Sequence, residues 1–260
     1  MKTVAIAGVG LIGGSFALAL RQAGFQGRII GVSSAATIDK AFALGVIDEA
    51  LPLAEAASDA DLVYLSQPIS QIIETLGVLD TDALVTDAGS TKAVICEAAR
   101  KLKRGRFVGG HPMAGKESRG VEQADADLFR GRPYVLTARE PELERWIERI
   151  GARLVILDPI QHDQHVAFVS HLPQLLSTAL AGVLAGKEQV AGPAAADLTR
   201  LALSPYDIWR DIFATNAGPI DAALAAFIGK LEELRTQLRS PEMERVFSQA
   251  AASARALRGK

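Results

Sequence analysis

The stretch KTVAIAGVGLIGGS, at residues 2–15, decides the fold of the N-terminal part of this chain. A short apolar run leads directly into Gly8, Gly10 and Gly13, and a helical pattern follows. The first glycine permits a tight turn, the second lets the backbone approach a phosphate, and the third lets the helix pack closely on the strand. The free N–H groups and the positive dipole end of that helix suit a pyrophosphate. The predicted cofactor contacts in this stretch are Gly8, Gly10, Leu11, Ile12 and Gly13.

Composition favours a globular enzyme and disfavours several other classes. With 260 residues, 49% hydrophobic content and a net charge of −2, the chain can bury a full core and has no overall field to recruit nucleic acid or an acidic membrane. Its single cysteine, Cys96, excludes an intrachain disulfide and a multi-cysteine metal site, which is typical of a cytoplasmic protein. The apolar stretch at residues 175–186 is too short to span a bilayer, so we expect a buried helix there. We therefore expect no nucleic-acid partner, no membrane partner, no metal and no cleavable leader.

Short β-rich runs alternate with helical patterns over the first 158 residues. The candidate strands after the first are residues 28–33, 62–66, 83–87, 107–110, 134–137 and 153–157. This alternation predicts an α/β fold with a mostly parallel, doubly wound sheet of the Rossmann type, whose ligands collect at the carboxyl ends of the strands. The polar motifs SQP at 66–68, DAGSTK at 87–92 and HPMAG at 111–115 follow three of those strands. Ser66 and Pro68 are accordingly expected at the cofactor.

The remainder of the chain, residues 159–260, is predicted to be an all-α domain. Alanine and leucine dominate there in helical spacing, broken by Gly-Pro and Ser-Pro pairs such as Gly218-Pro219. Apolar residues recur at steps of four and three, at Ile220, Leu224, Phe227, Leu231, Leu234 and Leu238. This seam indicates either a core helix or a helical half that packs on a second copy of the chain. We favour the second, a homodimer, because so many consecutive helices have no sheet to cover.

The order of the motifs resembles that of the prephenate and arogenate dehydrogenases of tyrosine biosynthesis. The resemblance covers nearly the whole chain, and it includes HDQHVAFVSHLP at 162–173 and TRLALSPYDIWRDIFATN at 199–216. Its most specific parts are HPMAGKESRG at 111–120 and SHLP at 170–173. It implies a Rossmann domain joined to a helical dimerisation domain. It also implies NAD- or NADP-dependent oxidation of a 4-hydroxycyclohexadiene carboxylate, in which loss of hydride and CO2 leaves an aromatic ring.

The same resemblance implies catalytic roles for two residues in the motifs that follow the strands. His111 matches the group that accepts the hydroxyl proton, and a neutral imidazole with an ordinary pKa of about 6.5 suits that task. The alternative is a His-Pro pair that merely ends a strand and makes a turn. Ser90 matches the serine that bonds the substrate hydroxyl and the nicotinamide region, although a serine there could also cap a helix.

A substrate with two carboxylates requires fixed positive charge. By resemblance Arg200 grips the ring carboxylate, for which a planar guanidinium gives two parallel bonds, whereas a solvated helix arginine is the alternative. The nearby Arg210 is interpreted as structural, paired with a neighbouring acid. Trp209 matches a residue that reaches the active site of the neighbouring subunit. Other positions that match the family's substrate site are Ser170 and the acids Glu117 and Asp197, which latch the cleft.

Gln174 marks a departure from the family pattern. Many prephenate-specific members carry histidine directly after HLP, where it binds the side-chain carboxylate, and this chain has an amide. A neutral amide attracts a second carboxylate less strongly than a histidine does. The residue therefore favours arogenate as the substrate, or use of both arogenate and prephenate. His162 and His171 are interpreted as structural histidines, because lone histidines on apolar helices are more often core residues than catalysts.

The end of the second predicted strand bears on cofactor choice. NAD enzymes usually place an acid there to bond the ribose 2′-hydroxyl, but this chain has Ser33-Ser34. Two hydroxyls can donate to a 2′-phosphate, so we predict NADP use with some NAD tolerance. Two alternatives stay open: another NADP-dependent reductase of this architecture, acting on an imine or 3-hydroxyacid, and a non-catalytic dinucleotide sensor.

Overall fold

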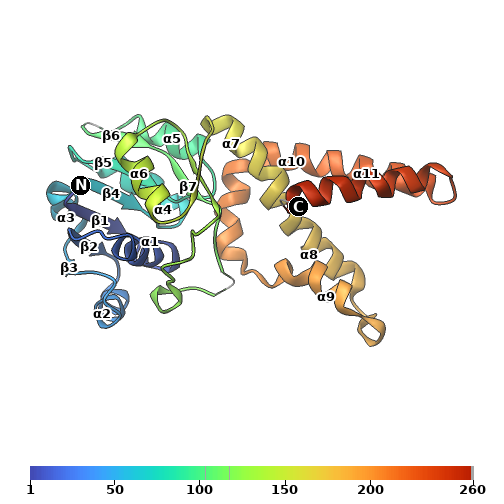
Figure 1. Ribbon diagram of the computed structural model, residues 1–260, viewed down its shortest axis with the longest axis horizontal. Helices are drawn as coiled ribbons and strands as arrows, with labels where there is room; N and C mark the ends of the chain where they lie inside the picture. The colour runs from blue at the N-terminus through green and yellow to red at the C-terminus, as the bar shows by residue number, and fades with distance from the viewer. Residues whose placement is uncertain (103, 117, 259–260) are drawn as a thin grey trace.

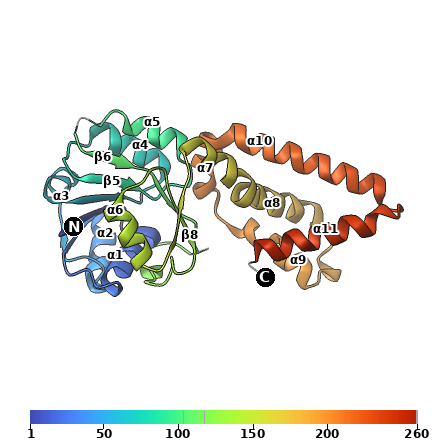
Figure 2. The ribbon, with the colours of Figure 1, turned by 45° about the horizontal axis from the view of Figure 1, so that its top comes forward.

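The chain forms a rounded α/β body from which helices project (Figure 1). The computed structural model describes residues 1–102, 104–116 and 118–258. The projecting helices make two arms, one of α8 and α9 and one of α10 and α11, and the second view keeps them outside the α/β body (Figure 2).

The main sheet has six parallel strands in the order β3-β2-β1-β4-β5-β6, which confirms the predicted Rossmann-type sheet. Its strands are β1 (Thr3–Ala7), β2 (Arg28–Val32), β3 (Glu49–Ala50), β4 (Leu62–Leu65), β5 (Leu84–Asp87) and β6 (Arg106–Val108). The order reverses between β1 and β4, and ligands of doubly wound sheets bind at that point. The two-residue β3 was not predicted, because a strand so short has no periodicity to detect.

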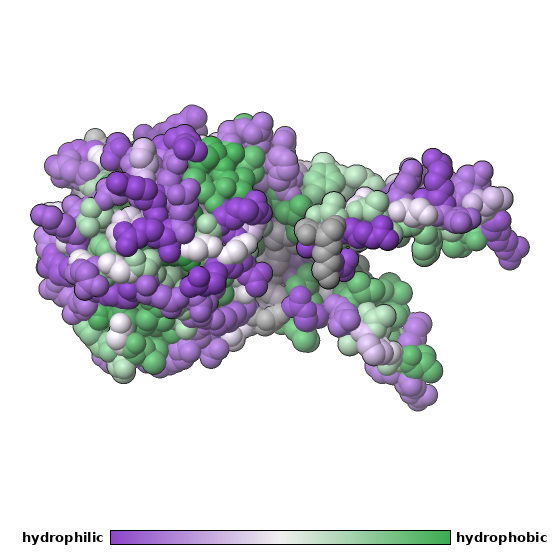
Figure 3. Space-filling model, in the orientation of Figure 1, coloured by the Kyte–Doolittle hydropathy of each residue, from purple (hydrophilic) through white to green (hydrophobic). Residues whose placement is uncertain are grey.

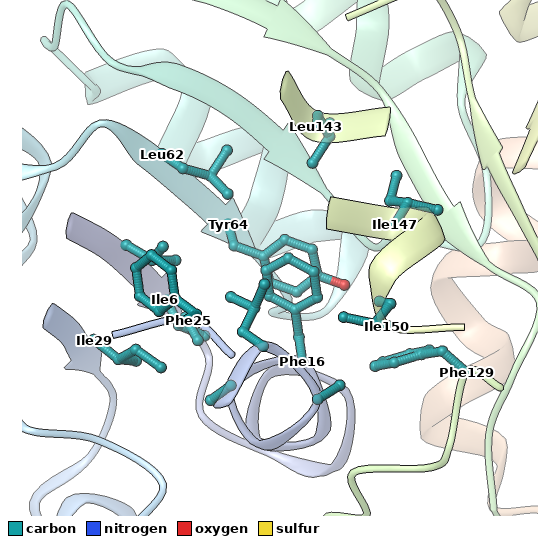
Figure 4. Packing of buried hydrophobic residues seen from close by; sticks show 14 of the residues in the cluster. Ile6, Phe16, Phe25, Ile29, Leu62, Tyr64, Phe129, Leu143, Ile147 and Ile150 are labelled. Carbon is teal, nitrogen blue, oxygen red and sulfur yellow. The ribbon is translucent and has the colours of Figure 1, made fainter. Parts of the chain in front are cut away.

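Helices cover both faces of this sheet and bury two separate clusters of apolar side chains. The helices that follow the strands are α1 (Leu11–Gln22), α2 (Ala35–Ala43), α3 (Leu53–Asp59), α4 (Ile69–Val78), α5 (Ala93–Ala99) and α6 (Pro141–Arg149). On one face α1 and α6 pack around Phe16, whose ring stacks on Tyr64 with centroids 4.0 Å apart (Figure 4). On the other face α4 and α5 share a cluster with Ile212 and Ile220 from the helical half. The two halves therefore share a hydrophobic core.

A second sheet contacts the first where β7 meets β5, and its first strand carries the start of the HPMAG motif. It contains β7 (Gly110–Pro112), β8 (Pro133–Leu136) and β9 (Arg153–Ile156), with β7 antiparallel to β8 and β8 parallel to β9. The predicted strand at 107–110 is therefore wrong as one element, because β6 ends at Val108 and the chain changes sheet. The change is fixed by side chains: the Gly109 amide donates to Thr137 Oγ1 and the Gly110 amide to Asp87 Oδ1.

The helical half begins at α7 (Pro159–Val166), whose first turn is capped by the Asp158 carboxylate. After a wide turn at Ala167–His171 come α8 (Leu172–Leu184), α9 (Pro193–Thr199), a tight turn at Arg200–Leu203, α10 (Tyr206–Gln237) and α11 (Glu242–Leu257). The expected break at Gly218-Pro219 is a kink within α10, centred on Asn216 with φ −131° and ψ 24°. A proline removes one helical hydrogen bond, and α10 bends there without ending.

The arms leave much apolar surface exposed in a single chain. The expected buried helix at 175–186 is wrong for the monomer, because among the α8 residues only Leu172, Gln174 and Ser177 are buried. Along the α10 seam the exposed fraction rises from 7% at Ile220 to 70% at Leu238. Figure 3 shows apolar surface on the sides of the two arms that face each other. By length and composition alone, Pro159–Leu184 and Tyr206–Gln237 would also suffice to cross a membrane, which is weak evidence because ordinary packed helices pass the same test.

Candidate active site

The glycine loop has the shape that a dinucleotide requires. Gly8 has φ +93°, and a Cβ on it would lie 2.8 Å from the Gln67 nitrogen. A Cβ on Gly13 would lie 2.3 Å from the Gly8 oxygen, so α1 approaches β1 more closely than any side chain allows. Gly10, by contrast, faces open space, and it caps α1 without a side-chain hydrogen bond. The first turn of α1 is thus open to a phosphate, and the loop fits the cofactor.

A cavity of about 410 Å³ lies between this loop and the start of α10. The predicted site residues that line it are Gly10, Leu11, Ile12, Ser66, Pro68 and Ser90. Sequence reasoning missed most of the remaining lining, which comes from the loop after HPMAG and from the first turns of α10. The available signal in the sequence was charge, because the motif KESRG and the pair Arg210-Asp211 place basic and acidic side chains in segments that line the cavity.

Ion pairs and hydrogen bonds tie the two halves together around this cavity. Arg119 lies 3.6 Å from Asp207 at the start of α10, which joins the two halves. Within α10 itself, Arg210 lies 3.3 Å from Asp211. Asp211 Oδ2 also accepts from the backbone N–H and the hydroxyl of Ser70 on α4, at 2.9 and 2.7 Å. These bonds, with the backbone bond from Ser70 the largest cause, lower the pKa of Asp211. The Asp211 carboxylate therefore stays ionised and holds α10 to the Rossmann domain.

His111 lies on β7, buried, at the end of a chain of polar groups. Its Nδ1 is 2.8 Å from His162 Nε2, and His162 Nδ1 is 2.7 Å from Asp163 Oδ1. Burial lowers the pKa of His111 well below 6.5, and the charges of His162, Lys92 and His171 lower it further. His111 is therefore neutral at physiological pH, as a proton acceptor must be.

One carboxylate fixes both loops that carry the predicted catalytic residues. Asp87 Oδ2 accepts from the Gly89 amide at 2.8 Å, beside Ser90, and Oδ1 accepts from the Gly110 amide at 3.0 Å, beside His111. The Lys92 ammonium pairs with the same carboxylate, and both side chains are fully buried.

Ser90 itself is half-buried in the cavity, and it does not cap a helix. The first residue of α5 is Ala93 and its N-cap is Lys92. The two backbone N–H groups of these residues donate to the Asp163 carboxylate, at 2.7 and 2.9 Å. The interpretation of Ser90 as an N-cap is therefore wrong, and within the described residues its hydroxyl makes no hydrogen bond.

The predicted substrate residues of the helical half lie outside the cavity lining. Arg200 is exposed at the start of the tight turn Arg200–Leu203. The amide nitrogen of Gln174 donates to the Leu201 carbonyl at 2.9 Å, and Ser177 Oγ accepts from the Ala202 amide at 3.0 Å. These two bonds from α8 fix the position of the turn that carries Arg200.

The other predicted residues are more scattered. Trp209 Nε1 donates to Ser204 Oγ at 2.9 Å and its ring meets the edge of His171. Ser170 is half-buried in the wide turn before α8, Asp197 is exposed on α9, and Glu117 falls outside the described residues. Ser33 and Ser34 are exposed just after β2, and Ser34 is the N-cap residue of α2.

The cavity lining thus contains predicted cofactor residues and Ser90, and it does not contain the predicted residues His111, Ser170, Gln174, Asp197, Arg200 and Trp209.

Comparisons with known proteins match both halves. The family described as "Prephenate dehydrogenase, nucleotide-binding domain" matches residues 16–159, and "Prephenate dehydrogenase, dimerization domain" matches residues 158–251. The prephenate dehydrogenase of Lactococcus lactis subsp. cremoris is 34% identical over 95% of this chain and 74% of its own length.

Two solved structures are similar over almost their full lengths. Prephenate dehydrogenase of Aquifex aeolicus, in complex with hydroxyphenyl propionate and NAD+, has 33% identity and a TM-score of 0.86, covering 100% of this chain and 99% of that one. Arogenate dehydrogenase of Synechocystis has 30% identity and a TM-score of 0.83, covering 98% and 99%. A 3-hydroxyisobutyrate dehydrogenase of Mycobacterium tuberculosis, at 18% identity and a TM-score of 0.52, shares the fold alone.

Proposed function

Because this chain belongs to the prephenate dehydrogenase family, we propose that it oxidatively decarboxylates prephenate, arogenate or both, with hydride transfer to a nicotinamide dinucleotide, in tyrosine biosynthesis. The observation that carries this proposal is the neutral, buried His111 on the strand beside the loop of Ser90, behind an open glycine loop. The two alternatives, a different reductase and a dinucleotide sensor, are not favoured, since the relatives that are at least 30% identical over more than nine-tenths of this chain are prephenate, cyclohexadienyl or arogenate dehydrogenases.

The proposed chemistry assigns one task to each group of the chain. When bound, the dinucleotide supplies the acceptor for the hydride that leaves the carbinol carbon. His111 takes the hydroxyl proton as that hydride departs, and Ser90 orients the hydroxyl. The electron pair of the bond to the departing carboxylate enters the ring as CO2 leaves, and His111 returns the proton to the phenolic oxygen. Arg200 holds a carboxylate of the substrate.

Gln174 supports use of arogenate. The side-chain atom of Gln174 that lies 2.9 Å from the Leu201 carbonyl oxygen must be the amide nitrogen, because a carbonyl can only accept a hydrogen bond. The same nitrogen lies 3.3 Å from Thr178 Oγ1, so both amide hydrogens have partners and the amide oxygen remains. An oxygen accepts from the ammonium group of arogenate and does not attract the side-chain carboxylate of prephenate. We therefore propose that arogenate is accepted at least as well as prephenate.

NADP is the proposed cofactor, with NAD tolerated. No acid follows β2 at Ser33 or Ser34, so nothing there repels a 2′-phosphate, and the Ser34 hydroxyl is 3.0 Å from that of Thr37. We further propose a cytoplasmic homodimer whose helical domain, residues 159–260, provides the interface, without nucleic-acid or membrane partners.

The test is turnover by the purified protein with each substrate and each cofactor. Reduced dinucleotide and aromatic product should appear in equal amounts, with the highest kcat/KM for arogenate and NADP. A Gln174→His variant should shift the ratio of the two substrates toward prephenate, and the same substitution at the exposed Gln164 of α7, Gln164→His, is the control. Absence of turnover with all four combinations would refute the proposal.

A further inference from the structure

We propose that His162 and Asp163 are positioning residues that set the tautomer of His111, so that His111 Nε2 carries the free lone pair. This inference deepens the proposed function, since it rests on His111 as the proton acceptor. It also corrects the interpretation of His162 as a merely structural histidine.

With both histidine rings neutral and the Asp163 carboxylate ionised, the donors and acceptors leave one arrangement. An ionised Asp163 carboxylate can only accept, so His162 Nδ1, 2.7 Å from Oδ1, carries a proton. The other nitrogen of a neutral His162 ring then accepts, and it lies 2.8 Å from His111 Nδ1, which must donate. A neutral ring has one N–H, so Nε2 of His111 is unprotonated. Within residues 1–102, 104–116 and 118–258, no hydrogen bond to that Nε2 is found.

The Asp163 carboxylate is held in place from several sides. It accepts the two N–H groups at the start of α5, and the backbone carbonyl of Asp163 accepts from Asn216 Nδ2 at 2.9 Å. The His162 side chain is fully buried. Rotating the carboxylate away would remove the cap of α5. The contacts at the start of α5 therefore keep the Asp163 carboxylate in place as the acceptor for His162 Nδ1.

Charge balance around His111 favours the same role. The groups that face it are Lys92, at the start of α5, His162 on α7 and His171 in the wide turn. The Lys92 ammonium is paired with the Asp87 carboxylate. Asp163 is then the anion left to stabilise positive charge when His111 takes a proton, and His162 connects the two.

The first experiment exchanges Asp163 for asparagine. The amide can donate to His162 Nδ1, which would place the proton of His162 on its Nε2. His162 Nε2 would then donate to His111 Nδ1, so the proton of His111 would move to its Nε2, the nitrogen that should accept the substrate proton. In the Ser-His-Asp triad the corresponding exchange imposes the wrong tautomer and lowers kcat about 10⁴-fold. We expect Asp163→Asn to lower kcat by about 10²–10⁴-fold, with the KM values and the dinucleotide Kd changed by less than about threefold.

Direct observation of the tautomer separates this role from a structural one. Two-bond 1H–15N correlation spectra of 15N-histidine-labelled protein at pH 8 distinguish Nδ1–H from Nε2–H rings, and the chain has 4 histidines. Spectra of His111→Asn assign the ring. The wild-type protein should show Nδ1–H at His111, and Asp163→Asn should show Nε2–H. An Nε2–H form of His111 in the wild-type protein would overturn the proposal, even if the chain turned over no substrate.

A conservative pair at His162 guards against loss of folding in Asp163→Asn. In His162→Gln the amide oxygen can still accept from His111 Nδ1, whereas His162→Met has no comparable acceptor. We expect His162→Gln to keep kcat within about tenfold of wild type and His162→Met to lose at least tenfold more. The exposed His165, changed to glutamine, is the control and should behave as wild type. Equal kcat in the Gln and Met variants would also overturn the proposal.

Discussion

The Asp87 carboxylate accepts a hydrogen bond from the Gly110 amide, 3.0 Å from Oδ1, and so anchors the strand of His111 to the end of β5. The same carboxylate neutralises the buried Lys92 ammonium. A buried charge that loses its partner is costly, whereas a pair removed together is not. The anchoring of the site and the stability of the domain therefore depend on one group.

Asp87→Asn should destabilise the protein by about 3–5 kcal/mol, because it leaves the Lys92 ammonium buried without its counter-charge. Lys92→Met should cost less, since the Gly89 and Gly110 amides still bond the carboxylate. The double variant should recover part of the loss. Urea unfolding gives the free energies. The control is Arg100→Met at the C-cap of α5, which breaks an exposed pair with Glu97 and should cost under about 1 kcal/mol. Equal costs for Asp87→Asn and the control would contradict this assignment.

His111→Asn should lower kcat by about 10²–10⁴-fold with little change in KM, because a general base contributes chiefly in the transition state. The pH profile should agree. His111 accepts a proton only when neutral, and its pKa lies well below 6.5, so the acid limb of kcat should fall below pH 6.5. That limb should vanish in the variant, while His165→Asn keeps it. A wild-type kcat in His111→Asn would remove this residue from the chemistry.

Arg200→Gln should chiefly raise the substrate KM, because the carboxylate that Arg200 holds is already charged in the ground state. A hydrogen bond to a charged group is worth about 1.5–3 kcal/mol, which corresponds to an increase of about 10- to 150-fold. Arg210→Gln, on α10, is the matched comparison, and it should leave that KM within about threefold, because Arg210 is paired with Asp211. Steady-state kinetics with saturating dinucleotide measures both. The reverse pattern would transfer the carboxylate contact to Arg210.

Ser33→Asp should reverse the cofactor preference. A carboxylate just after β2 bonds the 2′- and 3′-hydroxyls of NAD and repels a 2′-phosphate. We expect the ratio of kcat/KM for NADP over NAD to fall at least about tenfold, equivalent to about 1.4 kcal/mol. Ser33→Asn, of similar size and without charge, should change the ratio much less. If wild-type protein uses NAD alone, the argument from Ser33 and Ser34 fails.

The cofactor half of the site was predictable because local sequence determines it. Gly8 has a positive φ and Gly13 lies close to β1, and both positions require glycine. The spacing of the glycines after an apolar run is therefore enough to predict the loop. The strand predicted at 107–110 was wrong as one element, since the change of sheet after Val108 depends on the bond from Gly110 to Asp87, 23 residues away in the chain. No periodicity encodes such a contact.

The polar chain behind His111 was also beyond sequence reasoning. His162 and Asp163 are adjacent on one helix and reach His111 only because α7 packs beside α5. A buried histidine on a helix is usually structural, and only the distances from its two ring nitrogens to their partners in the fold reveal its hydrogen bonds. The expected burial of residues 175–186 failed for a different reason, since a helix that packs on a second copy has the same pattern as a core helix.

The exposed seam of α10 predicts a homodimer that a charge can break. Leu231 is 49% exposed and Leu238 is 70% exposed, although both continue the apolar spacing that begins at the buried Ile220. Burying such residues is worth about 1.5–3 kcal/mol each, and a charge placed between two apolar faces loses its hydration. The double variant Leu231→Glu, Leu238→Glu should therefore shift micromolar protein from dimer toward monomer in light scattering. Phe42→Glu on α2, where the wild-type ring is 45% exposed on the Rossmann domain, is the control and should remain dimeric. A wild-type monomer at micromolar concentration, or a fully dimeric double variant, would place the interface elsewhere.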